Sequence, residues 1–165
     1  MKFSVGVEYA LHCLLYMTDS PEGKSFGIKD LAAYQGVSET YLSKVFTRLK
    51  KAGILRSVPG VNGGYELAMA PETISFWDVV EAVEGSESWF QCAEIRQKEI
   101  LLDPDNLPEA FTKCPCLIKV VMQEGEEQMQ QYLKTKTLKW LREQVNEKVP
   151  EDYAQKTIEW FQSRR

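Results

Sequence analysis

The sequence is poor in histidine and contains no long apolar run. Its 165 residues include one histidine, His12, and four cysteines, which excludes any site that needs two histidines from one chain. No apolar run approaches the roughly 18 residues needed to cross a bilayer. Glu8 places an acid where a secretory signal would be apolar. We therefore expect a cytoplasmic protein whose cysteines are not paired in structural disulfides.

The chain also lacks an overall excess of basic residues. The formal net charge is −4, which argues against a protein that is basic over its whole surface. The charge is unevenly distributed, however, because residues 36–58 carry five basic side chains against Glu39 alone. A basic patch on an acidic chain suits a protein that presents one face to a polyanion.

The first 85 residues have the order of elements of a winged helix-turn-helix domain. Hydrophobic spacing near 3.6 residues predicts three helices, over 4–18, 28–35 and 39–52. Gly36 suits a helix C-terminus and Ser38 suits the N-cap of the next helix. A glycine-tipped hairpin with strands over 54–58 and 65–69 follows, and then a helix over 76–84. The predicted fold class is mainly α with a small β wing.

The second half divides into three predicted segments. Residues 86–116 lack periodicity, and a loop of this length is usually functional or held by something. Apolar spacing predicts one long helix from Leu117 to about Glu147, within a segment 117–149 that Pro150 ends. Residues 150–165 form a C-terminal extension, in which a short helix over 153–161 carries Trp160 and Phe161.

The second helix of a helix-turn-helix enters the major groove of DNA, and the wing contacts the backbone or minor groove. Leu42, Val45 and Phe46 would face the core, so the opposite face would meet DNA. The predicted DNA contacts are Ser38, Thr40, Tyr41, Ser43, Lys44, Thr47, Arg48 and Lys51, with Asn62 and Gly63 at the wing tip. The alternative is a helix-turn-helix that serves protein interaction, with its lysines on a solvated face.

Three cysteines and a Glu–His pair are candidates for a metal site. Cys92, Cys114 and Cys116 lie at the two ends of the irregular segment, although their spacing is not a strong metal signature. Glu8 and His12 are four residues apart on a predicted helix, so both side chains can reach one metal. A plain surface Glu–His pair remains the alternative. Cys13 is expected to be a small core residue.

Five stretches resemble the Rrf2 family of winged-helix transcription regulators, of the IscR and NsrR type. They are EYAL (8–11), VSETYLSK (37–44), LKKAGILRSV (49–58), NGGYEL (62–67) and ISFWDVVEAVEG (74–85). Two further stretches, VEYALHC (7–13) and CAEIRQ (92–97), resemble the family's [2Fe-2S] redox sensors. Lys119 stands where the IscR type has a histidine ligand, so that type of site is not expected.

The resemblance implies a homodimeric regulator of a double-stranded DNA operator, expected to be a repressor. A [2Fe-2S] cluster would control DNA affinity through its redox state or occupancy. Its implied ligands are Glu8 and His12 from one subunit and Cys92 and Cys116 from the other, with Cys114 as the alternative to Cys116. The segment 117–149 would be the dimerisation helix.

Other functions compete with this interpretation. A cluster-free regulator of the same fold would use its cysteine thiols or a small ligand as the switch. An adaptor would bind partners through the long helix and the Trp160–Phe161 tail, although a tail that caps the dimer is favoured. An enzyme is not expected, because the chain has one histidine, no nucleophile elbow and no glycine motif for an oxyanion near a cysteine.

Overall fold

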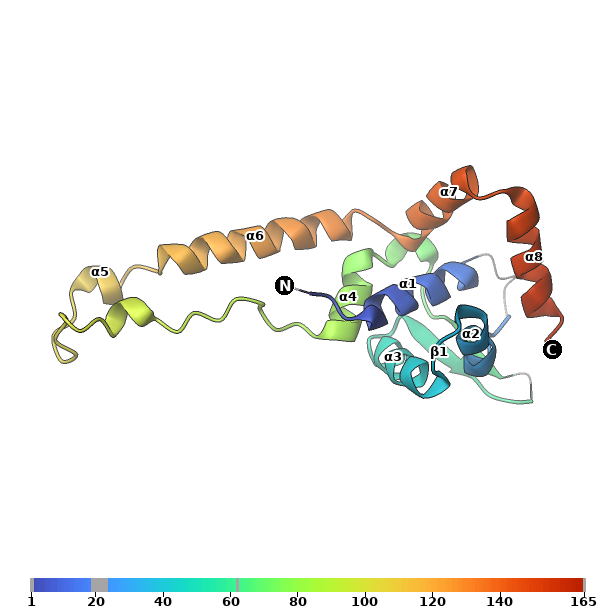
Figure 1. Cartoon of the computed structure of the whole chain (residues 1–165), viewed down its shortest axis with the longest axis horizontal. Coiled ribbons are helices and arrows are strands. Elements are labelled where there is room, and N and C mark those ends of the chain that lie inside the picture. The colour runs from blue at the N-terminus through green and yellow to red at the C-terminus, as the bar shows by residue number, and fades with distance from the viewer. Residues whose placement is uncertain (1, 19–23, 62, 165) are drawn as a thin grey trace. The chain divides into compact units, whose positions relative to one another are not determined.

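The computed structural model describes residues 2–18, 24–61 and 63–164 of the chain (Figure 1). It divides into two compact units. The larger unit combines Lys2–Ser86 with Leu133–Arg165, and the smaller unit is Glu87–Tyr132. In the described ranges, no helix is long and apolar enough to span a membrane.

The larger unit contains the winged helix-turn-helix. Its N-terminal helices are α1 (Val5–Met17), α2 (Ile28–Gln35) and α3 (Glu39–Lys51). Gly36 ends α2 in the left-handed conformation at φ 67°, which glycine adopts without strain. The Ser38 side chain accepts a hydrogen bond from the Tyr41 backbone N–H and caps α3. These elements match the predicted helices to within one or two residues.

The wing is a two-stranded antiparallel hairpin of β1 (Leu55–Val58) and β2 (Gly64–Leu67). Tyr65 also pairs with Phe26 in an isolated bridge, through hydrogen bonds of 2.8 and 2.9 Å between backbone N–H and carbonyl groups. A Cβ added at Gly64 would lie 2.4 Å from the Phe26 carbonyl oxygen. Glycine at this position therefore lets the segment before α2 lie against the hairpin.

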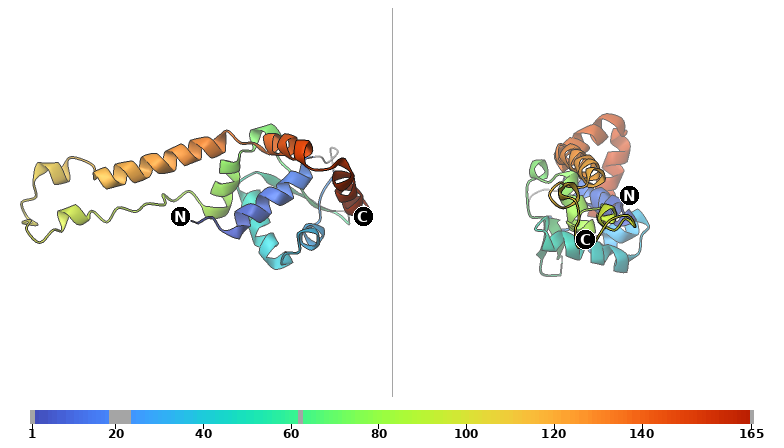
Figure 2. Two further views of the ribbon diagram at one scale, coloured as in Figure 1. Left: turned by 45° about the horizontal axis from the view of Figure 1, so that its top comes forward. Right: turned by 90° about the vertical axis from the view of Figure 1, so that its left-hand side faces the viewer.

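One hydrophobic core joins the helices of the larger unit. The helix α4 (Phe76–Glu84) packs against α1 and α3, and α7 (Leu138–Lys148) packs on α1 (Figure 2). Ser75 and Asp78 form a capping box that fixes the start of α4. The largest fully buried side chains come from α1, α2, α3, α4 and α7 and from Ile74 just before α4: Phe46, Leu14, Leu31, Leu42, Leu49, Ile74, Leu138, Val79 and Cys13.

The prediction of a single long helix from Leu117 to about Glu147, within the segment 117–149, is wrong. The structure has two helices, α6 (Leu117–Lys134) and α7, separated at Thr135–Thr137. The break follows from backbone pairing. Phe76 N–H donates to the Lys136 carbonyl at 2.8 Å, and Leu138 N–H donates to the Ile74 carbonyl at 2.9 Å. A continuous helix would have to give up both hydrogen bonds, and Thr137 instead caps α7.

The C-terminal extension is ordered as α8 (Glu151–Gln162), which confirms the predicted helix. Its Phe161 is buried, with its ring centroid 5.2 Å from that of Phe26 and 4.9 Å from that of Tyr34. The hydroxyl groups of Tyr34 and Thr157 lie 2.7 Å apart. The tail thus packs on α2 and the segment before it in its own chain.

The smaller unit is a long loop that runs back along α6. It contains a 3-10 turn, η2 (Ile95–Gln97), and the short helix α5 (Glu109–Thr112). Glu126 accepts hydrogen bonds from the Ser88 hydroxyl at 3.0 Å and the Trp89 N–H at 3.2 Å. These bonds fasten the start of the loop to the middle of α6.

Candidate functional site

The outer face of α3 carries the predicted DNA contacts. The core side of this helix buries Leu42, Val45, Phe46 and Leu49. Ser43 is half-buried, and the other candidates are exposed: Ser38, Thr40, Tyr41, Lys44, Thr47, Arg48 and Lys51. The helix therefore separates an apolar face from a polar and cationic one, as the periodicity predicted.

The free cations of this face are its lysines. Among the described residues, Lys44, Lys50 and Lys51 are exposed and have no ion pair. Arg56 instead forms a 2.6 Å ion pair with Glu66 across the hairpin. The Arg48 guanidinium donates to the Val83 carbonyl near the end of α4. Arg48 thus helps to hold α3 on α4, which the sequence did not indicate.

Tyr41 faces α1 as well as solvent. Its ring packs edge-on against Tyr9 with centroids 5.9 Å apart, and a Cβ added at Gly6 would lie 3.0 Å from its hydroxyl oxygen. Tyr9 directly follows Glu8 in α1. The start of α3 is therefore in direct contact with the turn of α1 that carries Glu8.

The wing tip is described only in part. Asn62, a predicted DNA contact, lies outside the described residues. Gly63 donates its N–H to the Gly60 carbonyl at 2.9 Å, and an added Cβ would lie 2.5 Å from the Val58 carbonyl oxygen. The turn itself therefore requires glycine at this position, whatever approaches it.

On α1, the predicted ligands and the predicted core cysteine are clearly separated. Glu8 and His12 are exposed and one helical turn apart. Cys13 is fully buried, and burial raises the pKa of its thiol to about 12. Its burial confirms the prediction that Cys13 is a core residue. A thiol in this environment also stays protonated, so it is a poor metal ligand.

The smaller unit brings together Cys92 and Cys116. Cys116 immediately precedes α6, and its carbonyl accepts the N–H of Val120 at 3.0 Å. Hydrogen bonds from the backbone N–H groups of Lys119 and Ile118 lower the pKa of its thiol, helped by the Cys92 thiol and the charge of Arg96. A thiolate at a helix N-terminus is stabilised in this way.

Cys114 is placed differently from Cys116. Its side chain is exposed, and its carbonyl accepts a hydrogen bond from Arg96. Of the two candidates, Cys116 is the one whose thiol pKa is lowered in part by Cys92. No three histidine, cysteine, aspartate or glutamate side chains gather as a metal site within the described part of a single chain.

Arg96 organises the segment that carries these cysteines. Its guanidinium pairs with Glu94 at 3.2 Å and also donates to the carbonyls of Ala110 and Cys114. Gln97 adds a 2.6 Å hydrogen bond to the Phe111 carbonyl. Glu94 adopts a left-handed φ of 48°, and its carboxylate accepts from the Cys92 thiol. We call these contacts of Arg96 and Gln97 with the carbonyls of Ala110, Phe111 and Cys114 the Arg96 clamp. The sequence did not predict it, although Arg96 and Gln97 lie in the CAEIRQ stretch (92–97).

A helix-turn-helix with a wing, and with unpaired lysines on its second helix, defines the class of winged-helix DNA-binding proteins. The model of the Rrf2 family, described as an iron-dependent transcriptional regulator, matches residues 3–144. The chain therefore belongs to the Rrf2 family of helix-turn-helix transcription regulators.

Individual relatives agree with this assignment. The protein rrf2 of Nitratidesulfovibrio vulgaris is 33% identical over 138 residues, which cover 84% of this chain and 85% of the relative. The oxidized form of CymR from Staphylococcus aureus is 25% identical, with a TM-score of 0.62 over 87% of this chain and 97% of that chain. The T. potens IscR structure shares the fold at 22% identity, with a TM-score of 0.65 over 93% and 96%. The family is described as one of transcriptional regulators, which agrees with the prediction of a regulator rather than an enzyme.

Proposed function

We propose that this protein is a DNA-binding repressor whose affinity for its operator is set by a [2Fe-2S] cluster shared between two subunits. The observation that carries the proposal is the pairing of Cys92 with Cys116 next to a helix N-terminus, where the Cys116 pKa is lowered. Iron–sulfur clusters bind thiolates. A cysteine pair with stabilised charge is a suitable half-site for one iron.

The second half-site is proposed on α1. Glu8 and His12 offer one carboxylate and one imidazole on the same exposed helical face. Two thiolates, an imidazole and a carboxylate complete the ligand set of a [2Fe-2S] cluster. When bound, the cluster would supply one-electron redox chemistry, and its nitrogen ligand would raise the potential, as in Rieske centres.

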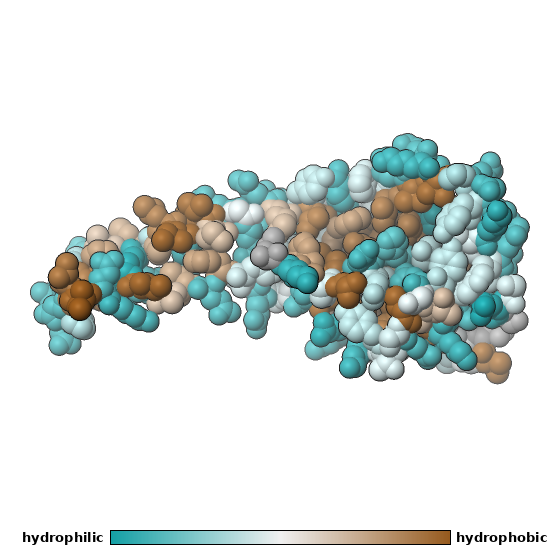
Figure 3. Space-filling model, in the orientation of Figure 1, coloured by the Kyte–Doolittle hydropathy of each residue, from teal (hydrophilic) through white to brown (hydrophobic). Residues whose placement is uncertain are grey.

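A second copy of the chain is the proposed partner for both half-sites. Regulators of this family act on DNA and are generally dimeric. The first turns of α6 expose large apolar side chains at helical spacing, and Figure 3 shows apolar side chains gathered there: Leu117 (78%), Ile118 (67%), Val121 (65%) and Met122 (48%). An exposed apolar face of this kind on a helix is suited to a subunit interface.

The contact between α1 and α3 offers a route from the cluster to DNA. A change in charge at Glu8 and His12 acts on the helix whose Tyr9 ring touches Tyr41. Tyr41 lies in the first turn of α3, at the end of the helix that meets base edges. A small shift of α1 would therefore be passed to the recognition helix.

The spectrum of protein purified without oxygen tests this proposal. We expect a coloured protein with equal amounts of iron and acid-labile sulfide, and a reduced form with an EPR signal. A colourless protein without iron would contradict the cluster.

Mixed dimers test whether the site is shared. A chain with Glu8→Ala and His12→Ala and a chain with Cys92→Ser and Cys116→Ser should each fail to hold a cluster alone. Their mixed dimer would regain one of its two sites if ligands come from both subunits. If the mixed dimer stays colourless, the four residues do not form an intersubunit site.

The same cysteine pair supports a second candidate, a cluster-free thiol switch. Hydrogen peroxide would transfer one oxygen to the Cys116 thiolate and form a sulfenic acid, and the second oxygen of the peroxide would take up a proton and leave as water. The Cys92 thiol would then attack the sulfenic acid sulfur, form the disulfide and release a second water. Mass spectrometry of peroxide-treated, metal-free protein should show a Cys92–Cys116 crosslink. If DNA binding depends on this crosslink and not on a cluster, the second candidate replaces the first.

A further inference from the structure

The C-terminal end of α4 receives its positive charge from α3. The last carbonyls of a helix have no partner within the helix, and the helix dipole favours a cation beside them. The last turn of α4 contains no basic residue. The Arg48 guanidinium fills this role, because it donates a hydrogen bond to the Val83 carbonyl. Arg48 thus stabilises this end of α4 with a charge that α4 itself does not supply.

The start of α1 is fastened to the same end of α4. Glu84, the last residue of α4, accepts hydrogen bonds from the Ser4 N–H at 2.9 Å and from the Ser4 hydroxyl at 2.6 Å. Its carboxylate therefore lies at the N-terminus of α1, where the helix dipole favours a negative charge. Gly6 permits this close approach, since an added Cβ would lie 3.2 Å from the Ser4 hydroxyl oxygen and 3.3 Å from a methyl carbon of Val83. One end of α4 thus holds both α1 and α3.

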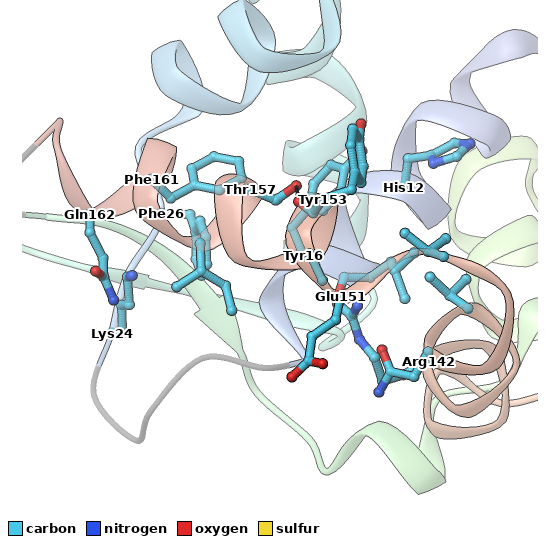
Figure 4. Close-up of a pocket in the computed structure, with 16 residues that line it drawn as sticks. His12, Tyr16, Lys24, Phe26, Arg142, Glu151, Tyr153, Thr157, Phe161 and Gln162 are labelled. Carbon is cyan, nitrogen blue, oxygen red and sulfur yellow. Dashed lines mark hydrogen bonds between the residues drawn. The ribbon is translucent and has the colours of Figure 1, made fainter.

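The other end of α1 is also fixed by hydrogen bonds. Arg142 extends from α7 toward α1 (Figure 4), and its guanidinium donates to the Leu15 carbonyl and, at 3.0 Å, to the Thr18 hydroxyl. Thr18 is the C-cap of α1. The helices α1, α4 and α7 therefore form a frame with hydrogen bonds at its helix ends, and Arg48 attaches α3 to that frame.

The hydrogen bond of Arg48 restrains α3 in a way that its apolar contacts do not. Leu42, Phe46 and Leu49 bury one face of α3, but hydrophobic contact has no preferred direction. A hydrogen bond requires a short distance and a nearly straight angle. The bond between Arg48 and the Val83 carbonyl therefore limits rotation and tilt of α3. Contacts with base edges need such a restraint, because the donors and acceptors of the major groove lie at fixed positions.

The chain also enters and leaves the smaller unit at the two ends of α4. Gly85 ends α4 with a φ of 95°, and the chain continues through Ser86 into the segment that carries Cys92. After α6 the chain returns, and the Lys136 carbonyl accepts the N–H of Phe76 at the start of α4 at 2.8 Å. A rearrangement of the smaller unit would therefore act on α4 at both ends.

We propose that Arg48 is a positioning residue for DNA reading. Its bond to the Val83 carbonyl holds α3 at the angle that an operator requires, and α4 passes a change in the smaller unit to α3 through this bond. The inference thus assigns to the protein interior a guanidinium that the sequence predicted to contact DNA. The first statement rests on the family assignment alone. The second rests on the proposed function, because it requires DNA affinity to depend on the cluster.

Two charge-matched variants, studied as purified without oxygen, test the first statement. Arg48→Met and Lys44→Met each remove one cation from α3, and Kd is measured on a genomic fragment selected with the wild type and on sheared genomic DNA. Arg48→Met should lower the ratio of specific to unspecific affinity at least tenfold, as expected for misplaced base contacts, and should leave the salt slope unchanged. Lys44→Met should lower the slope by about 0.9 and the ratio by less than threefold.

The ratio separates positioning from a loss of stability. Both affinities are measured on one sample, so an unfolded fraction lowers them equally and leaves their ratio unchanged. A lower salt slope or an unchanged ratio in Arg48→Met would overturn the inference, because Arg48 would then contact phosphate or contribute nothing to reading. Should that variant fail to fold, Arg48→Lys keeps the charge without the planar fork. Its slope should equal that of the wild type and its ratio should fall at least threefold, and a wild-type ratio would overturn the inference.

The oxidised and reduced holo-protein test the second statement. The wild type should show a difference of at least tenfold in Kd on the selected fragment, and Arg48→Met should reduce it to less than threefold. A full difference in Arg48→Met would show that the signal does not pass through this bond. If the wild type itself shows no difference, the proposed function fails, and the comparison of Arg48→Met with Lys44→Met still decides the role of Arg48.

Discussion

The Cys92 thiol lies close enough to Cys116, where the chain enters α6, to help lower the pKa of the Cys116 thiol. The two cysteines lie at opposite ends of an irregular loop, and Arg96 brings those ends together through the carbonyls of Ala110 and Cys114. The pair is thus formed by the protein's own hydrogen bonds. A ligand pair that is already assembled loses less conformational entropy when it binds its cofactor.

This placement predicts different effects for the two neighbouring cysteines. Cys116→Ser and Cys92→Ser should each remove the visible absorption of the anaerobic protein, because each would remove a thiolate from the same iron. Cys114→Ser should retain it, because the Cys114 side chain is exposed and contributes only its carbonyl to the Arg96 clamp. Iron content measured on the three variants checks this. Loss of iron only in Cys114→Ser would contradict this prediction and identify Cys114 as the ligand.

The lowered pKa of Cys116 predicts selective alkylation of the metal-free protein. The thiolate is the nucleophile, so iodoacetamide should modify Cys116 before Cys114 at pH 7. The rate should fall as the pH drops through the Cys116 pKa, because the thiolate becomes protonated. Cys13, with a pKa raised to about 12 by burial, should react only after unfolding. Peptide mapping at several pH values measures this order, and faster labelling of Cys114 would contradict it.

The unpaired lysines of α3 predict a salt-dependent contribution to DNA binding. Each phosphate contact contributes about 0.9 to the slope of log affinity against log salt. Lys44→Ala combined with Lys51→Ala should therefore lower the slope by about 2 on sheared genomic DNA, for which no operator is needed. Lys139→Ala, an exposed lysine on α7, is the matched control. An unchanged slope in the double variant would remove α3 from the phosphate contacts.

The packing of α8 predicts a stability cost for Phe161→Ala. The ring is 8% exposed and packs against Tyr16, Phe26 and Tyr34. Truncation of a buried phenylalanine costs about 3–5 kcal/mol, and we expect about 3 kcal/mol in urea unfolding. Gln162→Ala, at the exposed neighbouring position, should change the free energy of unfolding by under about 0.5 kcal/mol. Equal midpoints for the two variants would show that α8 does not pack as described.

The helices of the DNA-binding domain were predictable because their signals are local. The predicted bounds of 28–35 and 76–84 agree with α2 and α4. Gly36 and Ser38 act as the expected helix end and helix cap. Apolar spacing and capping residues determine such elements with little help from the rest of the fold.

Features set by tertiary contacts were not predictable. Apolar spacing continues from Val120 to Val145, yet backbone pairing with Ile74–Phe76 breaks the helix. Likewise, the partners of Phe161 and the clamp around Arg96 depend on residues far away in sequence. The set of cluster ligands was named from resemblance, and its arrangement between two subunits stays a prediction.

The most direct test of the central proposal compares the oxidised and reduced holo-protein on one operator. Genomic fragments are selected in parallel with both forms, and affinity for the recovered fragment is measured by anaerobic fluorescence anisotropy at fixed salt, with the metal-free protein as a third sample. We predict that the two redox forms differ at least tenfold in Kd and that the Glu8→Ala variant abolishes the difference. Equal affinity of the oxidised and reduced holo-protein would contradict redox control by the cluster.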